Sequence, residues 1–385
     1  MNVLALSLVL VAITHQAASI IAQQYLLDNK ILTKRGALVL QHSIGCLTLL
    51  LYLFFWPLAE SITGLKTPIY KDFTIFWIAI AWLTLCNLFI QSANVHARSL
   101  APPSLTVPFQ GMTPLLVTFT ALVFYEYPTL IGWVAISTIA VFTYLHGREG
   151  AVTPLDWWRG KTTGGTLLKD WLMPMRIAFR LQLPYNFATL NYEERETEME
   201  KAKRIKKGVR WAIASTFGGT FGLMGDGTAS RHGNIIWGLT VVFAIISLWY
   251  LTLPWLWYLL KKHLGYSVSL PEPILPSREN LRLHHWRIFL SGFGHATQWM
   301  LINIAFRLAP IAYIGSMKRL HIALVLVFAA VFLKDRKTRR FVTGLGITLG
   351  AAMLALDQSA QAFVIDSAEG YAFRLKEILA KLLSF

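Results

Sequence analysis

The stretch LAPIAYIGSMKRLHIALVLVFAAVFLKD, residues 308–335, decides how the rest of the chain is read. It is an apolar segment long enough to cross a membrane, and it carries Lys318 and Arg319 side by side near its middle. A charged side chain at the centre of a bilayer costs at least about 2.5–3.5 kcal/mol. The pair therefore requires an aqueous cavity, partner groups or an anionic ligand.

Composition places the whole chain in the same class. Of its 385 residues, 55% are hydrophobic and 15% are charged, whereas about a quarter of the residues of a soluble protein are charged. The net charge of +16 fits loops beside anionic lipid, so membrane lipids and no nucleic acid are expected as partners. We predict an all-α membrane protein whose ten transmembrane helices cover residues 3–27, 36–58, 73–94, 101–124, 129–146, 209–228, 233–260, 286–306, 310–333 and 340–357.

Several of these spans carry polar side chains that are costly to place against lipid. We expect such side chains to face the interior of the bundle or a water-filled cavity. They are His15, Gln16, Gln41, His42, Asn87, Gln91, Asn94, His295 and Gln298.

An internal repeat relates the fourth and ninth spans. Residues 94–126 align with residues 303–335 once Ser99 is treated as an insertion, and Gln110 then aligns with Lys318. Five helices separate the two copies, so the two halves run in opposite directions through the membrane. Two inverted five-helix repeats are typical of secondary transporters, whose substrate sites lie near the membrane midplane between the halves.

The repeat divides the chain into four regions. These are a first five-helix repeat at 1–147, a basic insertion at 148–208, a second five-helix repeat at 209–358 and an amphipathic tail at 359–385. Within the insertion, residues 166–183 favour an amphipathic helix at the membrane interface, kinked by Pro174. A plain linker between the halves is the alternative for the insertion.

The residues of the repeat carry a resemblance. The chain resembles the drug/metabolite transporter superfamily, specifically the EamA-type carriers of five plus five helices, over 100–126 and 308–335 and over the spans 128–146 and 341–356. The stretch GSMKRLHIALV at 315–325 is similar to the Lys-Arg stretch on the ninth helix of sugar-phosphate translocators. That similarity implies that Lys318 and Arg319 bind an anionic group such as phosphate, which suits their charge and geometry. The long insertion departs from the pattern of the family.

We therefore predict a secondary transporter that moves a small organic anion or phosphorylated metabolite by alternating access. Lys318 and Arg319 would bind the substrate, and Gln110, His295 and Gln298 would orient it. His321, one turn after Lys318, is a further candidate for the same site. In the competing interpretation the pair is structural, Arg319 pairs with a carboxylate such as Asp226, and the substrate is neutral or cationic. A lipid-handling membrane protein is a third reading.

The remaining expectations concern chemistry and location. No Walker A loop, HExxH motif or paired CxxC motif occurs in the sequence, so we expect no enzymatic activity, cofactor or metal. A homodimer is left open. Basic residues concentrate in the loops after odd-numbered spans, which predicts both termini outside, whereas the resembled family has both inside. Short loops and the lack of a targeting signal favour a bacterial inner membrane.

Overall fold

The computed structural model forms helices, and no strands, in the part of the chain that it describes. That part comprises residues 3–63, 71–101, 105–106, 109, 111–123, 127–147, 160, 163–181, 192–267, 269–325 and 338–357. The helices are α1 (Val3–Asp28), α2 (Lys34–Thr63), α3 (Phe73–Leu100), α5 (Thr113–Val123), α6 (Leu130–Gly147), α8 (Gly164–Trp171), α9 (Met173–Phe179), α10 (Tyr192–His232), α11 (Ile235–His263), α12 (Arg278–Ala305), α13 (Ile311–Met317) and α15 (Thr338–Leu356). The predicted tail and Gln110 lie outside the described residues.

Within the described residues, four helices are long and apolar enough to cross a membrane. They are α1 over Val3–Leu27, α2 over Lys34–Pro57, α3 over Phe73–Asn94 and α11 over Ile235–His263. Shorter apolar stretches occupy α5, α6 and α15. The expectation of an all-helical chain with several membrane-spanning helices is confirmed at this level.

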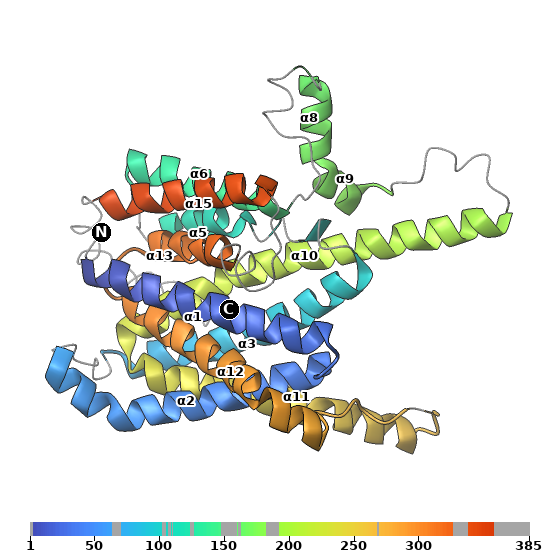
Figure 1. Cartoon of the computed structure of the whole chain (residues 1–385), viewed down its shortest axis with the longest axis horizontal. Coiled ribbons are helices and arrows are strands. Elements are labelled where there is room, and N and C mark those ends of the chain that lie inside the picture. The colour runs from blue at the N-terminus through green and yellow to red at the C-terminus, as the bar shows by residue number, and fades with distance from the viewer. Residues whose placement is uncertain are drawn as a thin grey trace, which may run out of the picture.

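The helices pack in pairs that come from distant parts of the sequence. Helix α1 lies against α12, α3 against α10, α2 against α11 and α12, α5 against α13, and α6 against α15. Figure 1 shows α6 and α15 along one edge of the bundle and α2 and α11 along the opposite edge. The bundle interior is therefore formed mainly by α1, α3, α10 and α12.

Polar side chains fix where several helices begin. Asp72 accepts a hydrogen bond from the backbone N–H of Ile75 (3.0 Å) at the start of α3, and Asn234 accepts one from Trp237 (3.2 Å) at the start of α11. Each bond satisfies a backbone donor that the first turn of a helix leaves without a partner. The short turn before Asn234 reverses the chain between α10 and α11.

The predicted sixth span, 209–228, is not a separate helix. It continues the charged end of the insertion as the single 41-residue helix α10, which extends beyond the bundle (Figure 1). The helix passes through Gly208 because that residue lies against Ala101, and a Cβ at Gly208 would come within 2.7 Å of the Ala101 Cβ. Close packing against α3 thus compensates for the low helix propensity of glycine.

Pro174 breaks the helix predicted over 166–183. Helix α8 ends at Trp171, and α9 starts at Met173 with the proline in its first turn. Proline lacks the N–H that the interior of a helix needs, but a first-turn N–H has no helical acceptor in any case. Ile177 of α9 is buried against the end of α3 and the middle of α10.

The ninth span is also interrupted, contrary to the continuous helix predicted over 310–333. Helix α13 ends at Met317, and helical structure resumes at residue 320. In between, the N–H of Arg319 donates to the carbonyl of Ser316 (2.9 Å), which is the tight three-residue spacing of a 3₁₀ turn. The Ser316 hydroxyl donates to the Ala312 carbonyl (2.7 Å), a contact that bends helices. Lys318 and Arg319 occupy this turn.

Candidate functional site

A cavity of about 610 Å³ lies inside the bundle, and the turn after α13 forms one end of it. It runs along α1 from Leu27 to Gln16, which is about 17 Å of helix. Its lining residues come from α1, α2, α3, α5, α10, α12 and that turn. They are Gln16, Ser19, Ile20, Gln23, Leu27, Lys34, Ala37, Leu38, Gln41, Asn87, Ile90, Gln91, Asn94, Thr113, Ser215, Thr216, Gly219, Gly222, Leu223, Asp226, His295, Trp299, Lys318, Arg319 and His321.

Three cationic side chains line this cavity. Lys34 is exposed at the start of α2, whereas Lys318 and Arg319 are partly buried at the other end. The Nζ atom of Lys318 lies 5.6 Å from the centre of the Trp299 ring, in a cation–π contact. The Nε atom of Arg319 is buried and has no hydrogen-bond partner among the described residues. A buried guanidinium nitrogen of this kind favours an acceptor supplied by a ligand.

Asp226 is the carboxylate that lines the cavity within the described part of the chain. It is only 5% exposed, and its Oδ1 accepts a hydrogen bond from Nδ2 of Asn303 (3.1 Å). Its charge interacts with that of Lys318, although the two form no direct ion pair in the described structure. The competing interpretation from the sequence paired Asp226 with Arg319. In the structure, the cation that interacts electrostatically with Asp226 is Lys318.

Aromatic rings and a histidine pair form the wall behind Lys318. The ring of His295 lies 5.7 Å from Trp299, 5.5 Å from Phe243 and 5.6 Å from His42, measured between ring centres. His42 itself is buried and bonded to the Leu38 carbonyl (2.8 Å). These contacts fix the orientation of His295 and Trp299 toward the cavity.

Neutral amides line the rest of the cavity, as predicted for Gln16, Gln41, Asn87, Gln91 and Asn94. Some of them already hydrogen-bond to one another or to hydroxyls. Gln23 donates from Nε2 to Oε1 of Gln41 (3.0 Å), and Ser215 donates to Oδ1 of Asn94 (2.8 Å). Such groups can donate to and accept from a hydroxylated or charged solute.

The predicted site residues have different outcomes. Lys318, Arg319, His295 and His321 come together around the cavity. Gln298 is fully buried away from it, and neither polar atom of its side chain has a hydrogen-bond partner among the described residues. Nothing in the structure bears on Gln110, which lies outside them.

Sequence reasoning missed Trp299 and Asn303. Both follow His295 at intervals of four, so the three side chains share one face of α12. Gln298, three residues after His295, points about 100° away from Trp299 at 100° per residue. A search along α12 for polar and aromatic residues spaced by four would have found this face.

Two further findings bear on the class of site. No group of three or more His, Cys, Asp or Glu side chains that could hold a metal occurs among the described residues. No protein-family model matches the chain, and no curated protein matches it either.

Proposed function

We propose that the protein is a secondary transporter of organic anions or phosphorylated metabolites in a membrane, of the EamA-like type that its sequence resembles. The observation that carries the proposal is the site at the inner end of the cavity. There Lys318 and Arg319 face a water-accessible space, and the Nε atom of Arg319 has no acceptor among the described residues. Cationic lining residues outnumber carboxylates, which favours an anion.

Two features support an architecture of ten spans in two inverted repeats. In the repeat, α1 corresponds to α10 and α3 corresponds to α12. The contact of α1 with α12 should therefore be matched by a contact of α10 with α3, and both contacts occur. The pairs α2–α11, α5–α13 and α6–α15 map onto themselves under the same exchange.

The interruptions of the fourth and ninth spans also correspond. The chain turns at Met112, whose N–H donates to the Phe109 carbonyl at the same three-residue spacing (3.0 Å). The repeat alignment pairs Met112 with Leu320, directly after the turn at Lys318 and Arg319. Discontinuous helices near the midplane are where such carriers bind substrate.

Alternating access requires one end of the bundle to be shut while the other is open. At the packed end, which we define by the apolar cluster around Tyr313, the α1 residues of that cluster are buried, namely Ala5, Val9, Ala12 and Ile13. At the hollow end, defined by Leu27, Lys34 and Asn94, the cavity separates the same helices. Lys34 and Arg35 lie at the hollow end, where Arg35 bonds to the Glu272 carbonyl in the segment after α11. By the positive-inside rule we assign this end to the cytoplasm, with a bacterial inner membrane as the proposed location.

A carrier of neutral or cationic metabolites is the second candidate. Asp226 favours it, because a carboxylate near Lys318 offsets part of the positive charge. The aromatic wall of Trp299 and His295 favours it as well, because a flat cation could stack there. The two candidates predict opposite ligand preferences.

A thermal-shift screen of the detergent-purified protein separates them. Phosphorylated sugars, nucleotides, amino acids and amphipathic cations are compared on the wild type, Lys318→Ala and Arg319→Ala. A ligand at one hundred times its Kd stabilises by about 2.7 kcal/mol. We expect only anions to stabilise the wild type, and both substitutions to remove that effect.

Lys261→Ala is the matched control. Its ammonium also lies over a tryptophan, 5.0 Å from the ring centre of Trp257, but at the end of α11 and outside the cavity. It should respond to anions like the wild type. Stabilisation of all four proteins by cations or neutral metabolites alone would reject the anion proposal.

A further inference from the structure

The position of Asp226 is fixed by tight packing on both sides. It lies between Gly225 and Gly227 on α10, and a Cβ on Gly227 would fall 2.0 Å from the Cδ1 atom of Ile311 in α13. Helix α10 thus lies directly against the start of the segment that carries Lys318. Asn303 donates to the carboxylate and also to the Trp299 carbonyl (3.0 Å), which ties Asp226 to the wall of the site.

A carboxylate buried this deeply needs compensation for its charge. Lys318 supplies part of it at a distance, without a direct ion pair among the described residues. An anion that binds Lys318 and Arg319 would bring a second negative charge into the same poorly solvated space. Two neighbouring negative charges disfavour each other, and the carboxylate can relieve the repulsion by binding a proton.

We propose that Asp226 takes up one proton when an anion binds, so that the carrier moves the anion and a proton together. This inference rests on the proposed function and adds its coupling ion. The proton comes from water and forms an O–H bond on the carboxyl group; no other bond changes. When the anion leaves on the other side of the membrane, the positive charge of Lys318 is no longer neutralised. That charge then stabilises the ionised form of Asp226 and so favours release of the proton.

Other titratable groups face the same space and must be distinguished from Asp226. His295 comes from α12, His321 follows the turn, and Cys86 of α3 interacts electrostatically with Asp226. His321 is the rival to test, since it lines the cavity and its Nδ1 lies 2.6 Å from the carbonyl oxygen of Lys318. Arg231, further along α10, donates instead to the Phe306 carbonyl (3.2 Å).

The experiment counts protons bound per anion. Isothermal titration calorimetry with glucose 6-phosphate and with inorganic sulfate, in two buffers of different ionisation enthalpy, gives that number directly. The wild type is compared with Asp226→Asn, which keeps the shape and hydrogen-bonding capacity of the side chain, and with His321→Gln. The difference between wild type and Asp226→Asn cancels protons that the ligand itself binds.

We expect this difference to be about one proton per anion near neutral pH, and Asp226→Asn to bind about tenfold more tightly at alkaline pH. His321→Gln should behave like the wild type. Anion binding with no difference between wild type and Asp226→Asn would overturn the inference and leave the proposed function standing. Loss of proton uptake in His321→Gln alone would also overturn it. Failure of both anions to bind any of the three proteins would reject the proposed function itself.

A second readout needs only the wild type, in case Asp226→Asn fails to fold. In proteoliposomes without a membrane potential, an imposed pH gradient should drive accumulation of glucose 6-phosphate on the alkaline side. Uptake that ignores the gradient while remaining sensitive to Lys318→Ala would overturn proton coupling.

Discussion

The two halves of helix α1 lie in opposite surroundings although they present the same face. Ala5, Val9 and Ala12 are fully buried in the apolar cluster of the packed end. Continuing at the same helical spacing, Gln16 and Gln23 line the cavity of the hollow end. The same face of α1 is therefore packed against apolar side chains where it carries small apolar residues, and lines the cavity where it carries amides.

The contrast shows what holds each end together. At the packed end, close contact of apolar side chains encloses a small polar cluster: the Tyr313 hydroxyl donates to Oδ2 of Asp357 (2.7 Å), and Thr129 also donates to that carboxylate. At the hollow end, Arg35 of α2 instead donates hydrogen bonds to backbone carbonyls in and after α11. Substitutions at the packed end should therefore cost the most stability.

The largest expected effect is that of Tyr313→Ala. The ring is 1% exposed and lies so close to α6 that a Cβ on Gly132 would come within 2.1 Å of its hydroxyl oxygen. Removing it leaves a large void and takes one hydrogen bond away from Asp357, so we expect a loss of about 3–5 kcal/mol in the free energy of unfolding in detergent. Tyr313→Phe, which removes only the hydroxyl, should lose about 1–3 kcal/mol. Equal losses in both variants would mean that the ring itself contributes little packing.

The next effect tests the two halves of α1 against each other. Val9→Gln introduces a buried amide without a prepared partner and should cost about 2–3 kcal/mol. Gln23→Leu removes an amide from a water-accessible wall and should change stability by about 1 kcal/mol or less. Unfolding measured in the same detergent compares the two directly. A larger loss for Gln23→Leu than for Val9→Gln would contradict the division into a dry and a wet half.

Much of this contrast was predictable from sequence. The uncharged runs predicted apolar helices, and the polar residues within them, such as Gln41 and Asn87, predicted an internal cavity. The Lys318–Arg319 pair in an apolar segment identified its inner end. These features depend on residue type alone, because the cost of placing charge or amide against lipid is the same in any fold.

The remainder depended on contacts that no local pattern records. The continuity of α10 through Gly208 follows from its fit against Ala101, which directly follows α3 and is more than one hundred residues away. Gln298 was predicted beside His295, but its orientation on α12 turns it away from the cavity. Whether Asp226 accompanies Lys318 or Arg319 depends on how α10 meets the turn after α13. Each of these features depends on tertiary contacts between helices.

A smaller loss of stability is expected when the hydrogen bonds of Arg35 at the hollow end are removed. Pro254 inside α11 has no N–H to give to the Tyr250 carbonyl, and Arg35 of α2 donates to it from Nε instead (2.9 Å). Its other nitrogens bind the carbonyls of Leu251 (2.8 Å) and Glu272 (3.0 Å). Arg35→Ala should cost about 1–2 kcal/mol, because water can replace part of the contact. Arg35→Lys should recover only part of the loss, since an ammonium cannot reproduce the planar fork.

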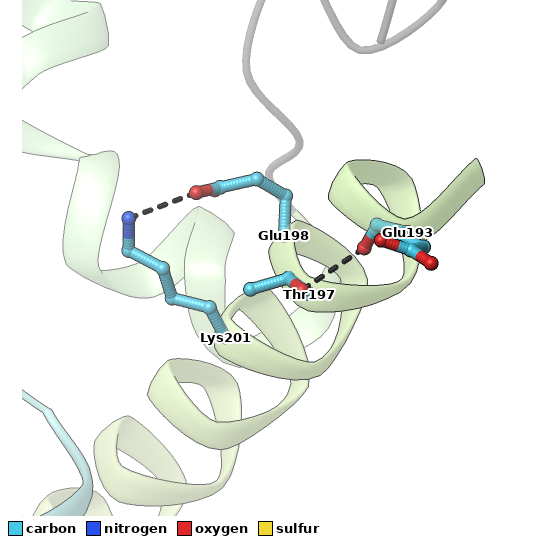
Figure 2. A network of polar contacts seen from close by, with 4 residues as sticks. All are labelled: Glu193, Thr197, Glu198 and Lys201. Atoms are coloured by element: carbon cyan, nitrogen blue, oxygen red, sulfur yellow. Dashed lines mark hydrogen bonds and ion pairs between the residues drawn. The ribbon is translucent and has the colours of Figure 1, made fainter. Parts of the chain in front are cut away.

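The smallest effect concerns the part of α10 that extends beyond the bundle. There Lys201 and Glu198 form an ion pair of 3.1 Å with side chains 62% and 32% exposed, and Thr197 bonds back to the Glu193 carbonyl (2.9 Å), as Figure 2 shows. A solvated pair at this spacing contributes about 0.5 kcal/mol or less. A double-mutant cycle of Glu198→Ala and Lys201→Ala measures it.

A coupling at or below that value would mean that water fully solvates the Glu198–Lys201 pair. A coupling above about 1 kcal/mol would require a poorly solvated pair. The exposed segment would then have to be covered by something outside the described chain, such as lipid headgroups or a second copy. Repeating the cycle in neutral detergent and in vesicles of anionic lipid distinguishes lipid headgroups from a second copy. A neutral detergent removes the anionic headgroups, so a coupling that depends on them should be lost there.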